Sequence, residues 1–286
     1  MERHRDRLRF VHGIGWHVWD GARWARDTNG AAMRAAINTV RAAYSDLGDL
    51  DRNAQAQLLA DIHRCESATG LDGVLRIAGS VLPIAASVDQ LDADPYLFNV
   101  TNGTLDLRTG RLRPHDPRDL VTKVAGCGYD READAPRFEQ FLAEIQPEPA
   151  TRSYIARVVG HALVGQVTEH LLPIFIGAGL NGKSTLLDLV AAVFGDYAMA
   201  AEPDLLVDRG AVHTTGQADL LGVRLAVCSE TDEGRKLAAA TVKRLTGGDK
   251  VRARRMRQDN IEFTPSHTVV MVTNHKPKVA GDDPAL

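Results

Sequence analysis

Residues 171–194 read LLPIFIGAGLNGKSTLLDLVAAVF, and this stretch decides the fold of the C-terminal half. The apolar run at 171–176 predicts a strand, and apolar residues at three- and four-residue spacing predict a helix over 183–194. Between them, GAGLNGKS at 177–184 is the complete G-x-x-x-x-G-K-S pattern. Backbone N–H groups in such a turn, together with the start of the helix, can hold an anion. The alternative is a chance glycine-rich turn, which the flanking strand and helix argue against.

The loop residues each have an expected role. Gly177, Gly179 and Gly182 should allow the backbone to turn its N–H groups toward one anion. Lys183 can reach the β- and γ-phosphates of a nucleotide, and Ser184 can ligate Mg²⁺. We therefore expect ATP and Mg²⁺ as cofactors. The predicted nucleotide-binding residues are Gly177, Ala178, Gly179, Leu180, Asn181, Gly182, Lys183, Ser184 and Thr185.

Strands and helices alternate after the loop, with a strand at 224–229, a helix at 236–245 and a strand at 268–273. This alternation predicts a parallel sheet flanked by helices, which with the glycine loop is a P-loop NTPase fold; the family resemblance given below implies that this fold is AAA-like. Glu230 follows the first of these strands, where it could polarise the attacking water and help hold Mg²⁺. Asp232 and Glu233 are weaker candidates, and a solvated acidic loop is the alternative. Asn274 follows the last strand, where it could orient the water or sense the γ-phosphate.

Residues 1–135 are expected to form a smaller α+β domain in front of an ATPase domain at 136–286. Two short strands flank Asp20-Gly21, helices are expected at 31–43 and 54–66, and turn signals at 98–112 predict a β-meander. The polar run 130–136 is the expected linker, followed by helices at 136–146 and 150–164. Trp16, Trp19 and Trp24 favour a core role over stacking on bases.

Composition limits the function only loosely. The net charge of -3 gives no general sign of nucleic-acid binding. The N-terminus lacks a signal peptide, and no apolar run approaches the roughly 18 residues that a membrane span needs. Cys65, Cys127 and Cys228 are far apart, which favours reduced thiols in a cytoplasmic protein over a metal site.

Taken together, these motifs resemble the superfamily 3 helicases, in particular the phage/plasmid primase-helicase family related to the poxvirus NTPase. The residues that carry the resemblance are GAGLNGKST at 177–185, SETDEG at 229–234, VKRLTGGD at 242–249 and VTNHKPKV at 272–279, with LFNVTNG at 97–103 and PHDP at 114–117 in the N-terminal half. The resemblance implies an ATP-dependent DNA helicase of phage, plasmid or prophage replication. It also implies a homo-hexameric ring around single-stranded DNA, with a primase or an origin-binding protein as further partners.

In that family a hairpin between the acidic strand and the last strand faces the pore. Alternation at 251–254 and 261–263 predicts two strands joined by a polar turn. Lys243 matches the basic residue of the motif before the hairpin. The expected DNA-binding residues are Lys243, Lys250, Arg252, Arg254, Arg255 and Arg257. The alternative is a solvated basic hairpin with ion pairs to Asp249 or Glu262.

The sequence departs from the family in two places. Ser229 stands where an Asp that helps to hold Mg²⁺ usually precedes the catalytic Glu. The family's arginine-rich segment, which supplies a finger to the adjacent site, is not found within 1–286, as in a fragment, a split gene or a decayed prophage gene. We therefore expect ATP binding with poor hydrolysis by this chain alone, and we expect no primase activity. An ATP-switched DNA-binding or assembly module and a small-molecule P-loop kinase remain as alternative functions.

Overall fold

The computed structural model describes residues 4–206, 215–229, 236–254 and 260–279. The chain forms two compact units, residues 1–91 and residues 92–286. Within the part of the chain that is described, no helix is long and apolar enough to cross a membrane.

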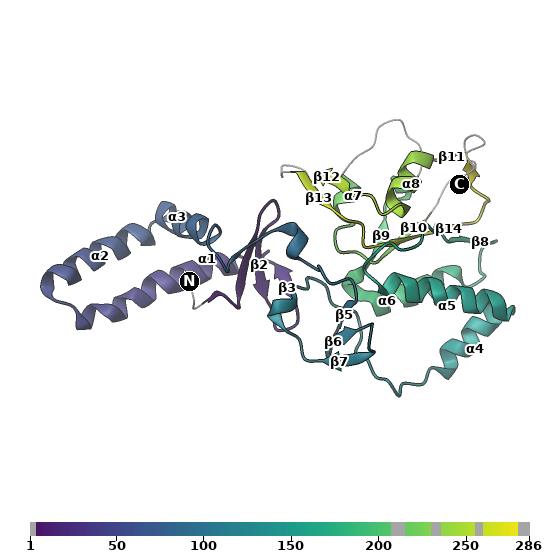
Figure 1. Cartoon of the computed structure of the whole chain (residues 1–286), viewed down its shortest axis with the longest axis horizontal. Helices are drawn as coiled ribbons and strands as arrows, with labels where there is room; N and C mark the ends of the chain where they lie inside the picture. Colours follow the sequence, from purple (N-terminus) through teal and green to yellow (C-terminus); the bar gives the residue numbers. More distant parts are fainter. Residues whose placement is uncertain (1–3, 207–214, 230–235, 255–259, 280–286) are drawn as a thin grey trace. The chain divides into compact units, whose positions relative to one another are not determined.

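The first unit combines a small sheet with three helices (Figure 1). The sheet has the order β3-β2-β1-β4, formed by β1 (Leu8–Val11), β2 (Gly15–Trp19), β3 (Trp24–Arg26) and β4 (Ala85–Ala86). The helices are α1 (Ala31–Ala42), α2 (Arg52–Glu66) and α3 (Ala68–Ala78), with short 3-10 turns η2 (Ala43–Asp49) and η3 (Val88–Gln90). The expected strands around Asp20-Gly21 and the two expected helices are confirmed, whereas β1, β4 and α3 were not anticipated. Trp24 is fully buried, as a core residue should be.

The second unit begins with the expected β-meander. It consists of β5 (Leu97–Val100), β6 (Gly103–Asp106) and β7 (Arg111–Arg113), all antiparallel, followed by the 3-10 turn η4 (Pro117–Asp119). Gly103 has a φ of 152°, and a Cβ there would lie 2.4 Å from the carbonyl oxygen of Arg113. Glycine is therefore required where β6 approaches β7.

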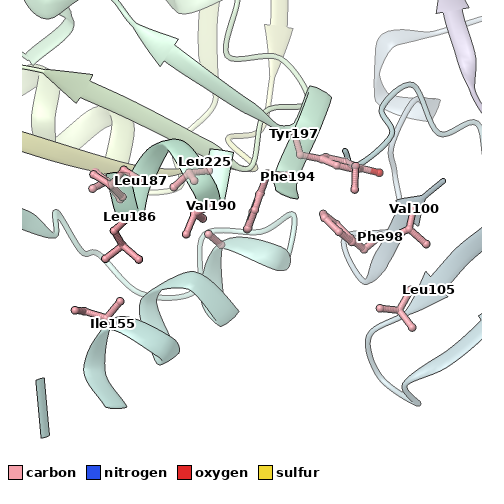
Figure 2. Packing of buried hydrophobic residues seen from close by; sticks show 13 residues of the cluster. Phe98, Val100, Leu105, Ile155, Leu186, Leu187, Val190, Phe194, Tyr197 and Leu225 are labelled. Carbon is pink, nitrogen blue, oxygen red and sulfur yellow. The ribbon is translucent and has the colours of Figure 1, made fainter. Parts of the chain in front are cut away.

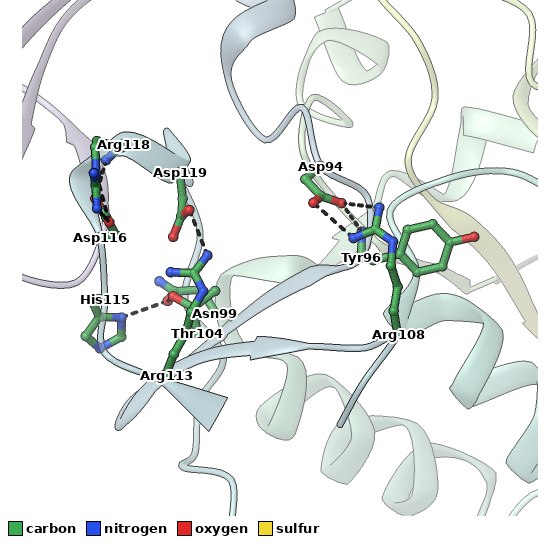
Figure 3. Close-up of polar contacts among 10 residues, drawn as sticks. All are labelled: Asp94, Tyr96, Asn99, Thr104, Arg108, Arg113, His115, Asp116, Arg118 and Asp119. Carbon is green, nitrogen blue, oxygen red and sulfur yellow. Dashed lines mark hydrogen bonds and ion pairs between the residues drawn. The ribbon is translucent and has the colours of Figure 1, made fainter. Parts of the chain in front are cut away.

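A buried amide holds this meander to the segment that follows it (Figure 3). Asn99 is fully buried, and its Oδ1 accepts hydrogen bonds from Thr104 Oγ1 at 3.0 Å and His115 Nδ1 at 2.8 Å. Its Nδ2 donates to the carbonyl oxygen of Lys123 at 3.0 Å. Because an unpaired buried amide is costly, this pairing gives the residues at 97–103 and 114–117 a structural role.

The main sheet is parallel and has the order β8-β14-β10-β9. Its strands are β8 (Ile174–Ile176), β9 (Ala198–Ala201), β10 (Leu225–Ser229) and β14 (Thr268–Thr273), and the helices before and after β8 are α4 (Pro136–Ile145), α5 (Pro149–Leu163) and α6 (Lys183–Phe194). The mixed α/β fold with a parallel C-terminal sheet is thus confirmed. β8 is shorter than the expected strand at 171–176, because Pro173 has no N–H to donate to a ladder.

Residues 236–237 correct the expected helix at 236–245. They form strand β11 (Lys236–Leu237), which pairs with β15 (Lys278–Val279), and helix α8 (Ala239–Thr246) starts only after Ala238. The remaining short elements are η5 (Gly195–Tyr197), η6 (Pro203–Leu206) and α7 (Thr215–Ala218).

The core of the second unit joins the meander to the sheet and its helices (Figure 2). Phe98 of β5 stacks on Tyr197 with ring centroids 4.7 Å apart and meets Phe194 of α6 edge-on at 5.8 Å. Ile155 of α5, Leu186 of α6 and Leu225 of β10 belong to the same buried cluster. Residues 92–135 therefore pack with the parallel sheet and its helices in the compact unit 92–286, and the expected domain boundary between 135 and 136 stays a prediction.

A buried arginine strengthens this junction. Arg224 is 3% exposed, and its Nη2 donates to the carbonyl oxygen of Leu97 at 2.6 Å, while its Nη1 donates to that of Leu163. The guanidinium lies 4.7 Å from the ring centroid of Tyr197. Burial lowers the pKa of Arg224 from its usual value. One side chain thus connects β5, the end of α5 and the start of β10.

Candidate functional site

The carboxyl edge of the parallel sheet brings together three segments that are distant in sequence. Ser229 at the end of β10 is the register partner of Val272, and Thr273 is that of Ile176. The N–H of Gly177 donates to the carbonyl oxygen of Thr273 at 3.3 Å. The glycine loop, residues 177–182, therefore starts beside the end of β14. In open parallel sheets, ligands bind in such crevices at the carboxyl ends of the strands.

The glycines of this loop act differently from the expectation. The backbone is left-handed at Leu180 (φ 64°) and Gly182 (φ 81°), not at Gly177 or Gly179. At Gly177 the constraint is space, because a Cβ would lie 2.2 Å from the side-chain amide nitrogen of Asn181. At Gly182 a Cβ would also lie 2.5 Å from a methyl group of Ile145. The left-handed backbone therefore favours glycine at 182, whereas a Cβ at 177 would require the exposed Asn181 side chain to shift.

Lys183 is folded back into the loop. Its Nζ donates to the carbonyl oxygen of Gly177 at 2.6 Å, to Asn181 Oδ1 at 2.9 Å and to the carbonyl oxygen of Ala178 at 3.3 Å. The first turn of α6 has no side-chain cap and no acidic residue. Its N–H groups and the positive end of its dipole are therefore available to an anion. Ser184 and Thr185 are exposed in this turn.

Of the other predicted catalytic residues, the structure describes Asn274 but not Glu230. Asn274 is exposed directly after β14, beside the start of the loop. Thr273, which the sequence reading missed, is buried, and its Oγ1 accepts from the N–H of His275 at 3.0 Å, so it shapes the turn that carries Asn274. Glu230 lies outside the described residues, as do Asp232 and Glu233. Burial raises the pKa of the neighbouring Cys228 to about 12, so that thiol stays protonated.

Among the residues that the structure describes, no three His, Cys, Asp or Glu side chains lie close enough together to form a metal centre. The predicted Mg²⁺ ligands are Ser184 and Glu230, and they remain a prediction. A hydroxyl beside a polyphosphate is a donor that suits Mg²⁺, which usually keeps several waters and binds to substrate phosphates.

Sequence reasoning missed a cavity that opens next to the glycine loop. Its volume is about 270 Å³, and its walls come from α5, the end of α4 and β8. Lys183 and Asn181 form one part of the lining, and the rest is mainly apolar. Tyr154 of α5 is among the lining residues and is 45% exposed, and no motif in the sequence pointed to it.

The predicted hairpin is confirmed as β12 (Val251–Arg254) paired antiparallel with β13 (Asn260–Phe263). Val251 and Ala253 are buried, while Arg252 between them is exposed. Lys250 Nζ lies 3.3 Å from Glu262 Oε1, which is the ion pair considered as the alternative. Lys243 is exposed on α8. The side chain of Arg254 and the residues Arg255 and Arg257 are not among those described.

The fold and the site define a class of protein: a mixed α/β chain in which an α+β region precedes a parallel sheet with a glycine-rich loop at its carboxyl edge. Residues 1–147 match the family model described as D5 N terminal like, which covers just over half of the chain, so the chain belongs to the D5 N terminal like family. Residues 175–285 match a second model, a family of unknown function called DUF5906.

Curated relatives come from large DNA viruses. A protein of Acanthamoeba polyphaga mimivirus named "Putative helicase" is 27% identical over 78% of this chain, and one of Invertebrate iridescent virus 6 with the same designation is 24% identical over 82%. A "Putative primase" of African swine fever virus is 28% identical over 71% of the chain. The matched regions are 24%, 25% and 22% of these proteins. The chain is thus a distant homologue of proteins named as helicases and primases, and it spans about a quarter of their length.

Among solved structures, the A form apo structure of the NrS-1 C terminal region is 12% identical. The match covers 76% of this chain and 50% of that one, with a TM-score of 0.47, which is too low to support an argument about the fold.

Proposed function

We propose that this chain is the ATPase part of a superfamily 3 DNA helicase that serves the replication of a phage, plasmid or related DNA element. ATP with Mg²⁺ would bind at the glycine loop, and single-stranded DNA would bind at the basic hairpin. The observation that carries the proposal is the placement of Lys183 at the uncapped start of α6, directly beside the end of β14.

The order of the strands supports a division of labour at the site. β14 lies between β8 and β10, so Asn274 follows the strand that lies between the one before the glycine loop and the one before Glu230 in the sequence. In this proposal Lys183 holds the β- and γ-phosphates, and Ser184 holds Mg²⁺. Glu230 polarises water, and Asn274 orients it toward the γ-phosphate. Positioning and charge stabilisation of this kind are the main contributions of proteins to phosphoryl transfer.

The contacts of Lys183 indicate which hydrogen bonds nucleotide binding would exchange. Its ammonium group is satisfied by three oxygens of the loop itself. Phosphate oxygens would have to replace some of these acceptors, and their negative charge makes the new hydrogen bonds stronger than those to neutral carbonyls.

The proposal is tested by measuring Mg-ATP binding calorimetrically for the wild type, Lys183→Ala and Arg252→Ala. Loss of the charge-assisted contacts in Lys183→Ala should weaken binding by about ten- to a hundred-fold. Arg252→Ala serves as the matched control, since it removes a cation from the hairpin and should leave ATP affinity unchanged. Unaltered ATP affinity in Lys183→Ala would refute the proposed site.

Hydrolysis is tested separately with Glu230→Gln. If the chain is an enzyme, phosphate release by the wild type should fall in this variant while ATP binding persists. ATP binding without any turnover by the wild type favours an ATP-switched module, and transfer of labelled phosphate to a small acceptor favours a kinase.

The proposal extends to assembly. We propose a homo-hexameric ring with a primase or an origin-binding protein as possible partners, by analogy with the family that the motifs resemble. Light scattering with and without Mg-ATP tests the ring, and a monomer in both conditions at micromolar concentration would contradict it.

A further inference from the structure

The cavity beside the glycine loop has two chemically different ends. Lys183 and Asn181 line one part of it, and among the described residues that line it Lys183 is the only cation. Ile155 and Val158 of α5 and Pro173 before β8 are among the apolar residues of the remaining wall. Tyr154 lies at this wall with 45% of its surface exposed. A ligand with an anionic tail and a flat apolar end is complementary to such a cavity.

We propose that this cavity receives the base of the nucleoside triphosphate whose phosphates Lys183 holds, and that Tyr154 stacks on that base. The inference rests on the proposed nucleotide site and adds a second subsite to it, built by the helix that precedes the phosphate-binding strand. The volume of about 270 Å³ is near the lower end of the roughly 300–1,000 Å³ typical of small-molecule pockets, and therefore suits one ring system.

A peptide segment is the rival occupant. β8 is an edge strand of the main sheet, and Ile174 and Ile176 are 36% and 48% exposed, so an added strand could cover them. The cavity, however, includes the ammonium-bearing side chain of Lys183 in its lining. A peptide strand would bring neutral backbone to this cation, whereas a nucleotide brings phosphate charge to it and an apolar ring to the remaining wall. The nucleotide thus uses both ends of the cavity.

The lining of the cavity also predicts how strongly the site discriminates between adenine and guanine. Gln146 and Thr151 are the polar side chains near the apolar wall, and no lining residue that the structure describes carries a carboxylate. A carboxylate is the strongest acceptor for the paired donors on guanine. Apolar walls distinguish similar ligands only weakly. We therefore expect ATP and GTP to bind with affinities within about ten-fold of each other.

The test compares Mg-ATP with Mg-tripolyphosphate, which has the phosphate chain and no base, by calorimetry on the full chain. Tyr154→Ala should weaken ATP binding about ten-fold, the scale of one lost base–aromatic contact, and leave tripolyphosphate binding unchanged. Tyr154→Phe keeps the ring and should restore ATP affinity. Thr151→Trp should fill the cavity and weaken ATP binding in the same selective way.

Leu189→Ala is the matched control, because Leu189 is an exposed apolar residue of α6 that does not line the cavity. Circular dichroism establishes that each variant is folded. The inference is overturned if the wild type binds tripolyphosphate as tightly as ATP, or if Tyr154→Ala and Thr151→Trp bind ATP normally; the proposed phosphate site then stands alone. If the wild type binds neither compound, the proposed function itself has failed and the base subsite falls with it.

Discussion

At the scale of single residues, His267 illustrates how burial alone can make stability depend on pH. It is 3% exposed, and burial lowers its pKa to about 4, with a contact to the Leu245 backbone offsetting this only in part. In the unfolded chain its pKa returns to about 6.5. Between pH 6.5 and pH 4, His267 is therefore protonated in the unfolded state but not in the folded state. The stability of the fold falls as the pH drops through this range.

We expect this one residue to remove up to about 3 kcal/mol of stability over that interval, and to contribute nothing above it. Urea unfolding at pH 7 and pH 5 should show a smaller difference in the free energy of unfolding for His267→Phe than for the wild type. His63→Gln, an exposed histidine of α2, is the control and should keep the wild-type difference. Equal pH dependence in His267→Phe and the wild type would contradict the prediction.

Lys183 and Asn274 were singled out from the sequence because a spacing pattern ties them to known chemistry, and their roles stay predictions. Residues that act through the shape of the fold give no such pattern. Leu180 was not expected to be left-handed, since β-turn rules favour glycine there. Tyr154 was missed because an exposed aromatic on a helix carries no motif; only folding brings it to the cavity.

At the scale of elements, the segment around Gly126 packs closely against the end of α6, and this contact requires glycine at two positions, 126 and 195. A Cβ on Gly126 would lie 1.9 Å from the carbonyl oxygen of Ala192, and the N–H of Gly126 donates to the carbonyl oxygen of Val193 at 2.9 Å. Gly195, which ends α6, is left-handed at φ 56° and equally crowded. The segment cannot move away without losing its hydrogen bond.

Gly126→Ala should therefore destabilise the fold by about 2 kcal/mol or more, as overpacked sites do. The matched control is Gly160→Ala in α5, where a Cβ would meet nothing within 4 Å. That change should stabilise by about 0.5–1 kcal/mol, because alanine favours the helix. Chemical unfolding of both variants measures the change in the free energy of unfolding. A stabilised Gly126→Ala would contradict the close packing of residue 126 against α6.

The hairpin of β12 and β13 leads to a prediction about DNA. Arg252 is exposed, whereas Lys250 is already paired with Glu262. Arg252→Ala should weaken single-stranded DNA binding and reduce the slope of log affinity against log salt by about 0.7. Glu262→Gln should strengthen binding, since it frees Lys250 and removes a negative charge. Fluorescence anisotropy at several salt concentrations measures DNA affinity for both variants. Unchanged affinity in both Arg252→Ala and Glu262→Gln would exclude the hairpin as the DNA contact.

Periodicity was a good guide to these elements where the pattern was long. The helices α5 and α6 and strand β14 lie where their apolar spacing placed them. The start of α8 was wrong because residues 236–237 pair with β15, a non-local contact that no local pattern reveals. β9 was missed for a similar reason: Ala198–Ala201 form a strand because β10 pairs with them, and their own sequence gives no strand pattern.

At the scale of the whole molecule, the compact units predict which part of the chain folds alone. Residues 92–286 contain the ring pair Phe98–Tyr197 and both backbone acceptors of Arg224. A chain that starts at residue 136 keeps Tyr197 and Arg224 but loses Phe98 and the Leu97 carbonyl. Its aromatic core would face water, and a buried guanidinium would lose a partner, each at a cost of a few kcal/mol.

We therefore expect residues 92–286 to unfold cooperatively and residues 136–286 to melt at a clearly lower temperature or to aggregate. Calorimetry on the two fragments and on the full chain measures this. Similar melting temperatures for the two fragments would show that the meander does not support the sheet. The sequence could not predict the packing of Phe98 on Tyr197, because the composition of a linker reports its solvent exposure and not which neighbour a meander packs against.

The interleaved strand order also bears on how the protein is made. Ile176 pairs with Thr273, so among the described strands a newly synthesised β8 has no pairing partner until β14 has left the ribosome. Contacts between distant segments form slowly, since the intervening chain must be closed into a loop first. The contacts of Phe98 with Phe194 and Tyr197 involve only earlier segments and can form while translation continues. The glycine loop should thus be among the last parts of the chain to become protected from proteases during synthesis.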